Sequence, residues 1–526
     1  MVLKIALLVV FFAVMIGVGL YCRKHSTNVD GFVLGGRAVG PWLTAFAFGT
    51  SYFSAVIFVG YAGQFGWSFG LASTWIGIGN AFIGSLLAWV ILGRRTRVMT
   101  QHLETKTMPD FFGKRYQSNA LKIAASLIVF IFLIPYTASL YNGLSSLFNM
   151  AFNLPFWAVI AIMAILTGIY VLFGGYMATA INDFIQGIIM LGGIIAVVAA
   201  VLINNGGLIN ATSALSQITD PSVPEGMQGA FTSFFGPNPV FLMFVVLLTS
   251  LGTWGLPQMV GKFYSIDNED SIKKGTVIST VFALIVAGGC YFLGGFCRLY
   301  SGIIPTVNGK VMNDSIIPTM LSTLPEIIIA IVIVLVLAAS MSTLSSLVLT
   351  SSSTLTLDVI VPFAERNGKK ISEKKKLFIL RAFIIFFIIV SAVIAIVKDK
   401  FNFTFIAQMM GVSWGALAGA FLAPFLFGLY SRRVSKASVA VCFVYGTALE
   451  TVQLLVSLGV IKLSGGFLGF VFTNSLYSGV FAMIGGLILV PVVSMFTKKQ
   501  NSKDVDAMFS CYDKKIAVDV SEHLGR

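Results

Sequence analysis

Residues 250–258 read Ser-Leu-Gly-Thr-Trp-Gly-Leu-Pro-Gln and lie within a long apolar run. Two glycines and a proline over this distance make a continuous helix expensive. A second unusual run, residues 48–55, reads Phe-Gly-Thr-Ser-Tyr-Phe-Ser-Ala and places hydroxyls around a glycine. Interrupted helices are tolerated in a membrane where they line a protein cavity, and a matched pair in two halves points to an inverted-repeat transporter. The competing interpretation is that small residues only let helices pack tightly.

The composition around these two stretches is that of a polytopic membrane protein. Of 526 residues, 57% are hydrophobic and 11% are charged, whereas soluble domains carry roughly 25% charged residues. A water-soluble enzyme, a disordered chain and a disulfide scaffold are therefore poor interpretations. The three His lie in polar segments and the five Cys form no metal-binding pair, so no metal or nucleophile constellation indicates an integral membrane enzyme.

Apolar runs of about 20 residues predict some thirteen membrane-spanning helices. The second to sixth spans and the seventh to eleventh would form two inverted repeats, because the interrupted spans are five apart. The predicted segments are an extra N-terminal helix at 1–22, a first repeat at 40–203, an extracellular loop at 204–237, a second repeat at 238–430, two extra helices at 437–496 and a cytoplasmic tail at 497–526.

The net charge of +14 follows loop position and does not indicate nucleic acid as a partner. Basic residues cluster in alternate loops, including residues 94–97, 106–122, 262–274 and 366–381. The positive-inside rule then places the N-terminus outside and the C-terminus in the cytoplasm of a multi-pass plasma membrane protein. In this count Lys262 is a loop charge.

Hydroxyl side chains crowd the ninth span, where residues 340–346 read Ser-Met-Ser-Thr-Leu-Ser-Ser. Ser342, Ser345 and Ser346 fall at i, i+3 and i+4 and share one helix face. Oxygen ligands of this kind suit a small hard cation such as Na⁺, by analogy with other hard cations. The alternative is that the hydroxyls bond to the carbonyls of their own helix.

Asp183 is a carboxylate near the start of the sixth span. An acid inside the membrane is a functional candidate by default. The alternative is an interfacial Asp that is favoured by the dipole of its helix.

Four stretches carry a resemblance to a known family: residues 31–37 (Gly-Phe-Val-Leu-Gly-Gly-Arg) with 40–42 (Gly-Pro-Trp), residues 107–112 (Thr-Met-Pro-Asp-Phe-Phe), Asn182-Asp183 with Gln186, and residues 341–345 (Met-Ser-Thr-Leu-Ser). Together they resemble the sodium:solute symporter family over nearly the whole chain. The resemblance implies a LeuT-type fold, Na⁺ as the coupling ion, uptake by alternating access and a monomeric transport unit.

The resemblance also implies two ion sites. The main Na⁺ site would use backbone carbonyls of Thr50, Phe53 and Ala339 and hydroxyls of Ser342 and Thr343. The motif of a second Na⁺ site, found in some members, maps onto Asp183, Ser342, Ser345 and Ser346. One or two Na⁺ are therefore expected.

The substrate pocket is expected where the two interrupted spans face each other, because free helix-end N–H groups there can bind a carboxylate without an arginine. The side chains in reach would be Ser54, Gln64, Tyr136, Thr253, Trp254, Pro257 and Gln258. The chain departs from the family's proline-transporting branch at Tyr52, Val56, Thr249 and Thr253, and its fourth span lacks the arginine of sialate-transporting relatives.

The expected substrate is a small organic solute, an amino acid such as proline or a monocarboxylate. The alternatives are a Na⁺-coupled sugar or polyol symporter and, in a different class, a passive channel. A channel needs a continuous polar path and usually a symmetric filter, and no filter-like repeat is present.

Overall fold

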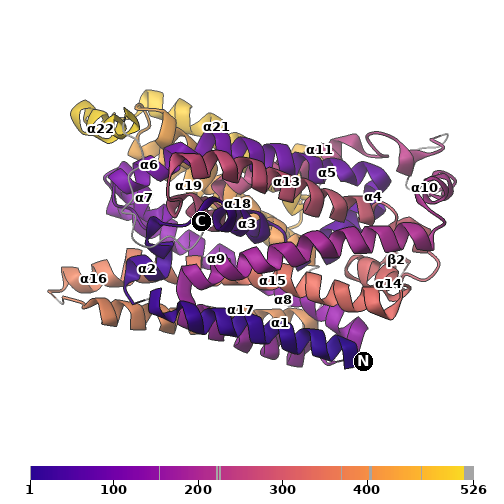
Figure 1. Cartoon of the computed structure of the whole chain (residues 1–526). Coiled ribbons are helices and arrows are strands. Elements are labelled where there is room, and N and C mark those ends of the chain that lie inside the picture. Colours follow the sequence, from indigo (N-terminus) through magenta and orange to yellow (C-terminus); the bar gives the residue numbers. More distant parts are fainter. Residues whose placement is uncertain are drawn as a thin grey trace.

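A computed structural model describes residues 2–513 apart from 26, 153, 221–222, 224–226, 308, 369, 402–405 and 464. The described chain is almost entirely helical, and its long helices run side by side in one bundle (Figure 1). The long helices are α1 (Val2–Tyr21), α8 (Asn119–Phe152), α9 (Phe156–Asn204), α13 (Glu269–Gly294), α15 (Glu326–Leu355), α17 (Glu373–Phe401), α18 (Ile406–Tyr430), α19 (Lys436–Ser457) and α21 (Ser475–Phe496).

The short elements gather at the two ends of the bundle. At one end lie α2 (Val29–Leu34), α6 (Arg94–His102), α7 (Met108–Arg115), α16 (Val361–Arg366) and α22 (Ser502–Phe509), on the left of Figure 1. At the other end lie α10 (Leu208–Ser216), α14 (Ile316–Ser322), α20 (Gly466–Phe472) and the hairpin of β1 (Thr306–Val307) and β2 (Lys310–Val311). This grouping agrees with the predicted inner and outer loops, and the orientation itself stays a prediction.

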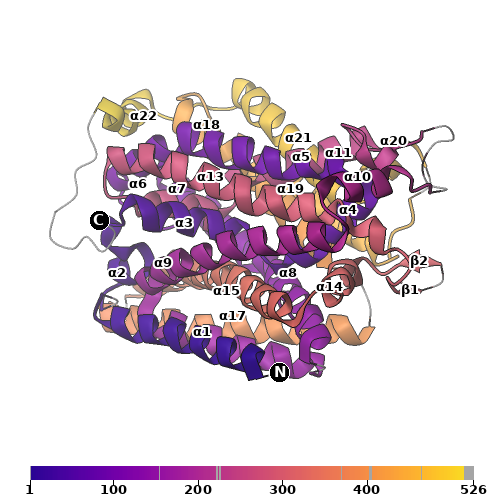
Figure 2. The ribbon, with the colours of Figure 1, turned by 45° about the vertical axis from the view of Figure 1, so that its right-hand side comes forward.

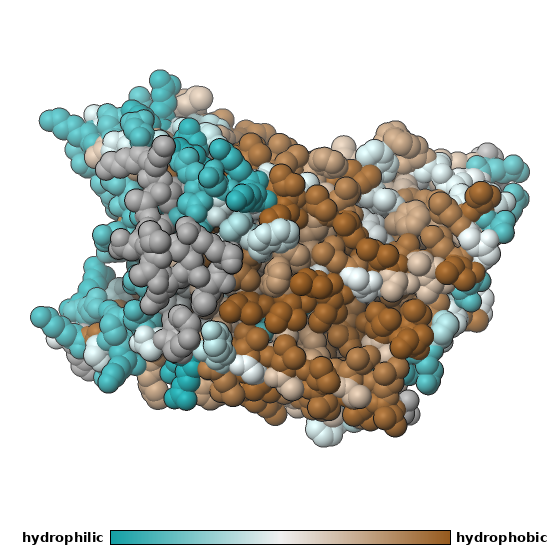
Figure 3. Space-filling model, in the orientation of Figure 1, coloured by the Kyte–Doolittle hydropathy of each residue, from teal (hydrophilic) through white to brown (hydrophobic). Residues whose placement is uncertain are grey.

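An apolar band separates these two ends on the face shown in Figure 3, where hydrophobic side chains occupy the middle of the molecule. Among the described residues ten helices are long and apolar enough to cross a membrane, or eleven if one bent pair is counted as a span. The band is what an exterior solvated by lipid requires.

Two of these helices are too long to be single spans. The run Val56–His102 has 47 residues and α9 has 49, which at 1.5 Å per residue is about 70 Å, against a hydrocarbon core of roughly 30 Å. Each contains one glycine with positive φ: Gly70 (φ 62°) and Gly175 (φ 56°). These glycines divide each helix into two segments, and the total of thirteen spans stays a prediction.

The two spans that the sequence marked are both interrupted. Helix α3 (Pro41–Tyr52) ends at Phe53, and α4 (Ala62–Phe69) continues the span after the π-helical stretch η3 (Val56–Tyr61). In the other span α11 (Pro239–Leu251) and the turn η8 (Gly252–Gly255) are followed by Leu256 and α12 (Pro257–Tyr264), with a bend of 46°.

The backbone takes nearly the same shape at both breaks. Phe53 has φ −88° and ψ 124°, and Leu256 has φ −86° and ψ 119°. Both are extended residues set between two helical segments. The Tyr52 hydroxyl donates to the Thr249 carbonyl at 2.9 Å, so the two interrupted spans face each other, as predicted. The repeat boundaries at 40–203 and 238–430 stay predictions.

Helix α15 lies among other helices of the bundle. It packs against α9, α8, α17 and α3, and Figures 1 and 2 both place it among the first three of these. Every residue from Val332 to Leu349 except Val334 is buried, which explains why the hydroxyls of this helix meet protein and not lipid.

The described part of the polar tail, residues 497–513, packs against the end of the bundle. Arg432 pairs with Asp506 at 2.6 Å, and Arg115 donates to the side-chain oxygen of Gln500 at 2.8 Å. The Tyr512 hydroxyl donates to the Leu429 carbonyl at 3.0 Å. Helix α22 therefore docks on the end of the bundle, and residues 514–526 lie outside the described part.

Close helix packing predicts one sensitive glycine. A Cβ at Gly66 in α4 would lie 2.0 Å from the Gly294 carbonyl oxygen, whereas a Cβ at Gly17 in α1 meets nothing within 4 Å. Gly66→Ala should lower the free energy of unfolding by about 1–3 kcal/mol through overpacking. The measurement is the thermal unfolding midpoint in detergent, with Gly17→Ala as the matched control. Equal midpoints for the two variants would contradict this packing.

Candidate ion and substrate site

The break after α3 exposes backbone carbonyls to the hydroxyls of α15. Ser342 Oγ donates to the Thr50 carbonyl at 2.9 Å. Thr343 Oγ1 lies 3.3 Å from the same oxygen and 3.2 Å from the Phe53 carbonyl. Because Phe53 is extended, its carbonyl has left the helical ladder and needs a partner from elsewhere.

The fifth predicted residue of the main ion site joins the same cluster. The Ala339 carbonyl accepts from Thr343 Oγ1 at 3.1 Å and from Ser342 Oγ at 3.3 Å. The structure thus brings all five residues together: Thr50, Phe53, Ala339, Ser342 and Thr343. A hydroxyl can rotate to turn a lone pair toward a cation, so five neutral oxygens can converge on one Na⁺. That role remains a prediction.

Asp183 lies on α9 and is fully buried. It comes eight residues after the break at Gly175, beyond the first turn where a helix dipole acts. The Lys262 ammonium lies 3.5 Å from Asp183 Oδ2 and donates to Ser346 Oγ at 3.0 Å. The carboxylate therefore faces an ammonium group inside the bundle and lies outside the reach of a helix-start dipole.

The predicted second ion site is only partly assembled as the motif implies. Asp183 and Ser346 are joined through Lys262, whereas Ser345 Oγ donates to the Ser342 carbonyl of its own helix at 2.9 Å. Sequence reasoning missed Lys262, because a lysine at the end of an apolar run counts as a loop charge under the positive-inside rule. The available signal was that Lys262 follows Gln258 by four residues, so that the two side chains share one face of a helix.

Three buried polar atoms gather on the other side of the break. Ser54 Oγ, the Tyr136 hydroxyl and Trp414 Nε1 make no hydrogen bond to any other part of the described chain, and Tyr136 interacts with the other two. Tyr136 lies beside both other side chains, and its ring is 6.0 Å from that of Trp414 at 88°. The Tyr52 ring packs on Trp414 at 5.7 Å. We call Ser54, Tyr136, Trp414 and Tyr52 the aromatic chamber.

The aromatic chamber is a cluster of four side chains that combines polar groups with aromatic rings, a combination that small-ligand sites also use. A buried polar atom without a partner costs about 1–3 kcal/mol, so a ligand that pairs with three such atoms relieves that cost. Aromatic rings around them supply apolar contact. Trp414 was not predicted, since a lone Trp in the eleventh span carries no spacing signal.

The other predicted pocket residues lie elsewhere. Thr253 Oγ1 bonds to the Gly84 carbonyl at 3.2 Å, and Trp254 Nε1 donates to the Ile83 carbonyl at 3.0 Å. Both side chains thus face the stretch η5 (Asn80–Leu87). Gln64 lies further along its span on α4, with its amide oxygen buried and without a partner among the described residues. Of the seven predicted residues, only Ser54 and Tyr136 meet in the chamber.

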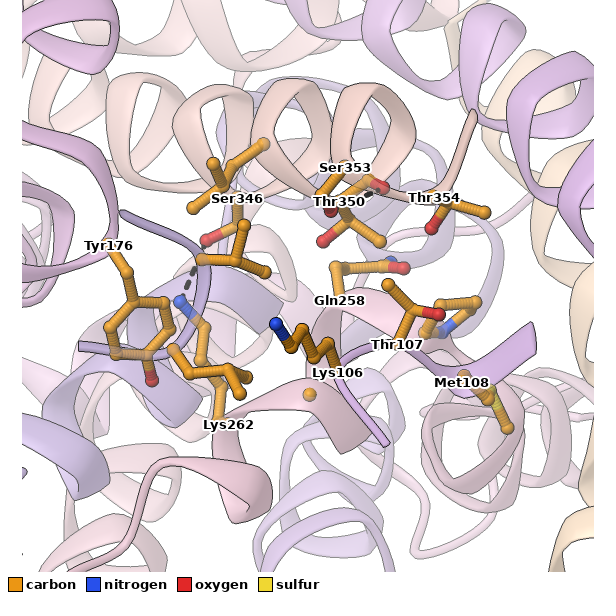
Figure 4. Close-up of a pocket in the computed structure, with 15 residues that line it drawn as sticks. Lys106, Thr107, Met108, Tyr176, Gln258, Lys262, Ser346, Thr350, Ser353 and Thr354 are labelled. Atoms are coloured by element: carbon orange, nitrogen blue, oxygen red, sulfur yellow. Dashed lines mark hydrogen bonds between the residues drawn. The ribbon is translucent and has the colours of Figure 1, made fainter. Parts of the chain in front are cut away.

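Pro257 and Gln258 line a narrow pocket of about 50 Å³ at the predicted cytoplasmic side (Figure 4). The pocket runs from Lys106 and Thr107 in the loop before α7 to Lys262 and Ser346. In Figure 4 Gln258 points toward the hydroxyl groups of α15. Polar side chains such as Gln258, Thr350 and Ser353 line part of this pocket, which reaches Lys262, the partner of Asp183.

A buried polar network ties the loops together at the mouth of this pocket. Thr107 caps α7 by accepting from the Asp110 N–H at 3.1 Å, and it donates to Asp358 at 2.5 Å. Lys122 bridges Asp110 at 2.7 Å and Asp358 at 3.3 Å. The Thr-x-Pro-Asp motif is thus a helix cap that also fastens α7 to the end of the α15 segment.

Arg37, from the other quoted motif, reaches into the same region. Its guanidinium donates to the Thr105 carbonyl at 2.5 Å and the Tyr264 carbonyl at 3.2 Å. Burial lowers the pKa of Arg37, although an arginine stays charged at neutral pH. Arg37 therefore joins the loop before α7 to the end of α12.

Comparison with known proteins shows which family this chain resembles. The family model described as the sodium:solute symporter family matches residues 32–446. The chain is 27% identical over 495 residues to the osmoregulated proline transporter OpuE of Bacillus subtilis (strain 168), covering 93% of this chain and 94% of that protein. It is 28% identical over 503 residues to the sodium/proline symporter of Staphylococcus aureus (strain JH9), covering 94% and 92%.

A solved structure shares the fold. It is described as the substrate-bound outward-open state of a Na⁺-coupled sialic acid symporter, with a TM-score of 0.71, 17% identity and coverage of 95% of this chain and 99% of that one. This likeness confirms the predicted LeuT-type, all-helical fold.

The hydroxyls at the main ion site give a direct test. Ser342→Ala and Thr343→Ala should each weaken Na⁺ binding more than tenfold, or about 1.4 kcal/mol, because no water or lipid can replace these oxygens inside the bundle. The measurement is equilibrium binding of radioactive Na⁺ to the purified protein. Ser340→Ala is the matched control, since Ser340 Oγ bonds to the Val336 carbonyl of its own helix at 2.7 Å. Unchanged affinity in both variants would remove the main site.

Proposed function

The chain belongs to the sodium:solute symporter family, and we propose that it takes up proline, or a zwitterion of similar size, together with Na⁺ by alternating access. Membership makes it a Na⁺-coupled transporter of the plasma membrane and not an enzyme. The identity of the solute, the residues that bind it and the number of Na⁺ are our proposals.

The observation that carries the proposal is the position of the aromatic chamber beside the ion cluster. At the break the Phe53 carbonyl turns toward the Thr343 hydroxyl. Ser54 is the next residue, so the same break places its side chain in the chamber. An ion at the main site would hold this break in shape. Binding of the solute and of Na⁺ would then be coupled through two adjacent residues, which is what symport needs.

The chemistry of the chamber fits a small zwitterion with an apolar body. The Ser54 and Tyr136 hydroxyls and the Trp414 N–H can donate to a carboxylate. The helix that restarts after Ser54 leaves N–H groups without intrahelical partners, and such groups favour an anion. The Tyr52 and Trp414 rings would pack on a pyrrolidine ring. The two relatives named above are both described as proline transporters.

A sialic acid is a poor fit for this chain. Helix α8, which carries Tyr136, has Lys122 as its only basic residue, and Lys122 is bound to Asp110 and Asp358 at the end of the bundle. The chamber thus offers neutral donors to a carboxylate. A monocarboxylate would use the same neutral donors for its carboxylate, whereas a sugar or polyol would bind through its hydroxyl groups alone.

Transport in proteoliposomes tests the proposal. Radioactive proline should accumulate when Na⁺ is outside and not when K⁺ replaces it. Unlabelled proline should compete, while lactate, glucose and mannitol should not. Uptake that ignores the Na⁺ gradient would favour the passive channel. Competition by glucose or mannitol, with none by proline, would replace the substrate assignment.

Removing one hydroxyl from the chamber should separate solute binding from ion binding. Tyr136→Phe should raise the KM for proline about 5–10-fold, because it deletes one hydrogen bond worth about 1–1.5 kcal/mol. The Na⁺ concentration for half-maximal uptake at saturating proline should change less than about twofold on the same scale. Tyr445→Phe is the control, since the Tyr445 hydroxyl bonds to the Phe481 carbonyl at 3.1 Å outside the repeats. An unchanged KM would exclude Tyr136 from the site.

A further inference from the structure

We propose that the ammonium group of Lys262 acts as a tethered cation that takes the place of a second Na⁺ beside Asp183, so that one Na⁺ accompanies each solute. This inference rests on the proposed Na⁺-coupled transport. It assigns a role in ion stoichiometry to a lysine that sequence reasoning had placed in a loop.

Lys262 is held inside the bundle by three neighbours. Its ammonium is 3.0 Å from Ser346 Oγ and 3.5 Å from Asp183 Oδ2, and it lies 5.3 Å from the centre of the Tyr176 ring. Its side chain is 4% exposed and that of Asp183 is 0% exposed. An ammonium has three N–H donors, and a hydroxyl, a carboxylate and an aromatic face give each of them a target.

The charges around Asp183 balance with one cation and not with two. Asp183 supplies one negative charge and Lys262 one positive charge. The other cation that lines the pocket, Lys106, is paired with Asp30 at 2.8 Å. A Na⁺ added beside the lysine would leave an uncompensated buried charge, which is costly in a low-dielectric interior. Without the lysine, Na⁺ would restore neutrality.

Lys262 also uses the oxygens that a second ion would need. The motif implies four ligands. The lysine contacts two of them, Asp183 on α9 and Ser346 on α15. Ser346 is further engaged with Ser51 at 2.8 Å. A Na⁺ that contacts both Asp183 Oδ2 and Ser346 Oγ would have to displace the ammonium group.

The same contacts connect the lysine to the main ion cluster. Ser346 lies one turn after Ser342, and Ser51 follows Thr50. The chain of contacts from Lys262 through Ser346 to Ser51 therefore ends beside two residues of that cluster. The pocket in Figure 4 reaches Lys262 from the predicted cytoplasmic side, so an ion could enter the position if the side chain were shortened.

Counting bound Na⁺ on the purified full-length protein tests the inference. Equilibrium binding of radioactive Na⁺ in the presence of proline should give one ion per wild-type chain and a Hill coefficient of one for uptake. Lys262→Ala should give two ions and a Hill coefficient above one. Lys262→Arg keeps the positive charge and should bind one Na⁺ per chain. The double variant Lys262→Ala with Asp183→Asn should also bind one Na⁺ per chain.

Matched controls separate this effect from a general loss of charge. Lys106→Ala removes the other pocket lysine and should leave the count at one. Folding of each variant is checked by its thermal unfolding midpoint. If Lys262→Ala does not fold, Lys262→Gln serves instead, and the wild-type count stands as a test without any variant.

The outcomes distinguish the inference from the function on which it rests. Failure of the wild type to bind Na⁺, or uptake in K⁺ equal to that in Na⁺, overturns the proposed function. Two ions on the wild type overturn the tethered cation alone. A folded Lys262→Ala protein that binds one ion, or none, also overturns it. Loss of proline binding with one ion retained would assign Lys262 to the solute instead.

Discussion

The structure depends on the rule that a backbone polar group inside the hydrocarbon region must find a partner in the protein. At Phe53 the helical ladder stops, and its carbonyl turns to the Thr343 hydroxyl of α15 at 3.2 Å. This explains why α15, a helix rich in hydroxyl groups, is enclosed by protein over most of its length. Side-chain oxygens thus replace the missing backbone partners and form a cluster that a hard cation can use. The proposed ion site is therefore a consequence of the break.

Both halves of the chain meet this constraint, but they meet it with different residues. The break at Leu256 is set by Gly255 and Pro257, whereas the break at Phe53 has no proline and is held by hydroxyls from another helix. A break fixed by covalent geometry is stiff, while one held by hydrogen bonds can be strengthened by an ion. We infer that the first interrupted span is the responsive one and the second is the rigid partner.

Much of this was predictable because Gly, Pro and clustered hydroxyls act locally on a helix. The two interruptions, the shared face of Ser342 and Ser346 and the choice of Asp183 as a candidate residue all follow from sequence. The directions in which the Thr253 and Trp254 side chains point did not follow from sequence. Both lie in the turn η8, and residue spacing does not fix how far such a turn rotates its side chains. Trp414 and Lys262 were missed because their roles depend on which helices become neighbours. The docking of α22 depends likewise on tertiary contacts of Asp506 and Tyr512.

The choice between a second Na⁺ and a built-in cation is a choice about driving force. A tenfold Na⁺ gradient supplies about 1.4 kcal/mol and a potential of 100 mV about 2.3 kcal/mol per charge, so one Na⁺ concentrates a neutral solute roughly 500-fold. Two Na⁺ would square that ratio. Under the tethered-cation proposal, the carrier gives up the larger ratio, yet its buried carboxylate stays paired with Lys262 when no ion is bound. Such a carrier can return empty without exposing an unpaired charge to the low-dielectric interior, which favours turnover when Na⁺ is scarce.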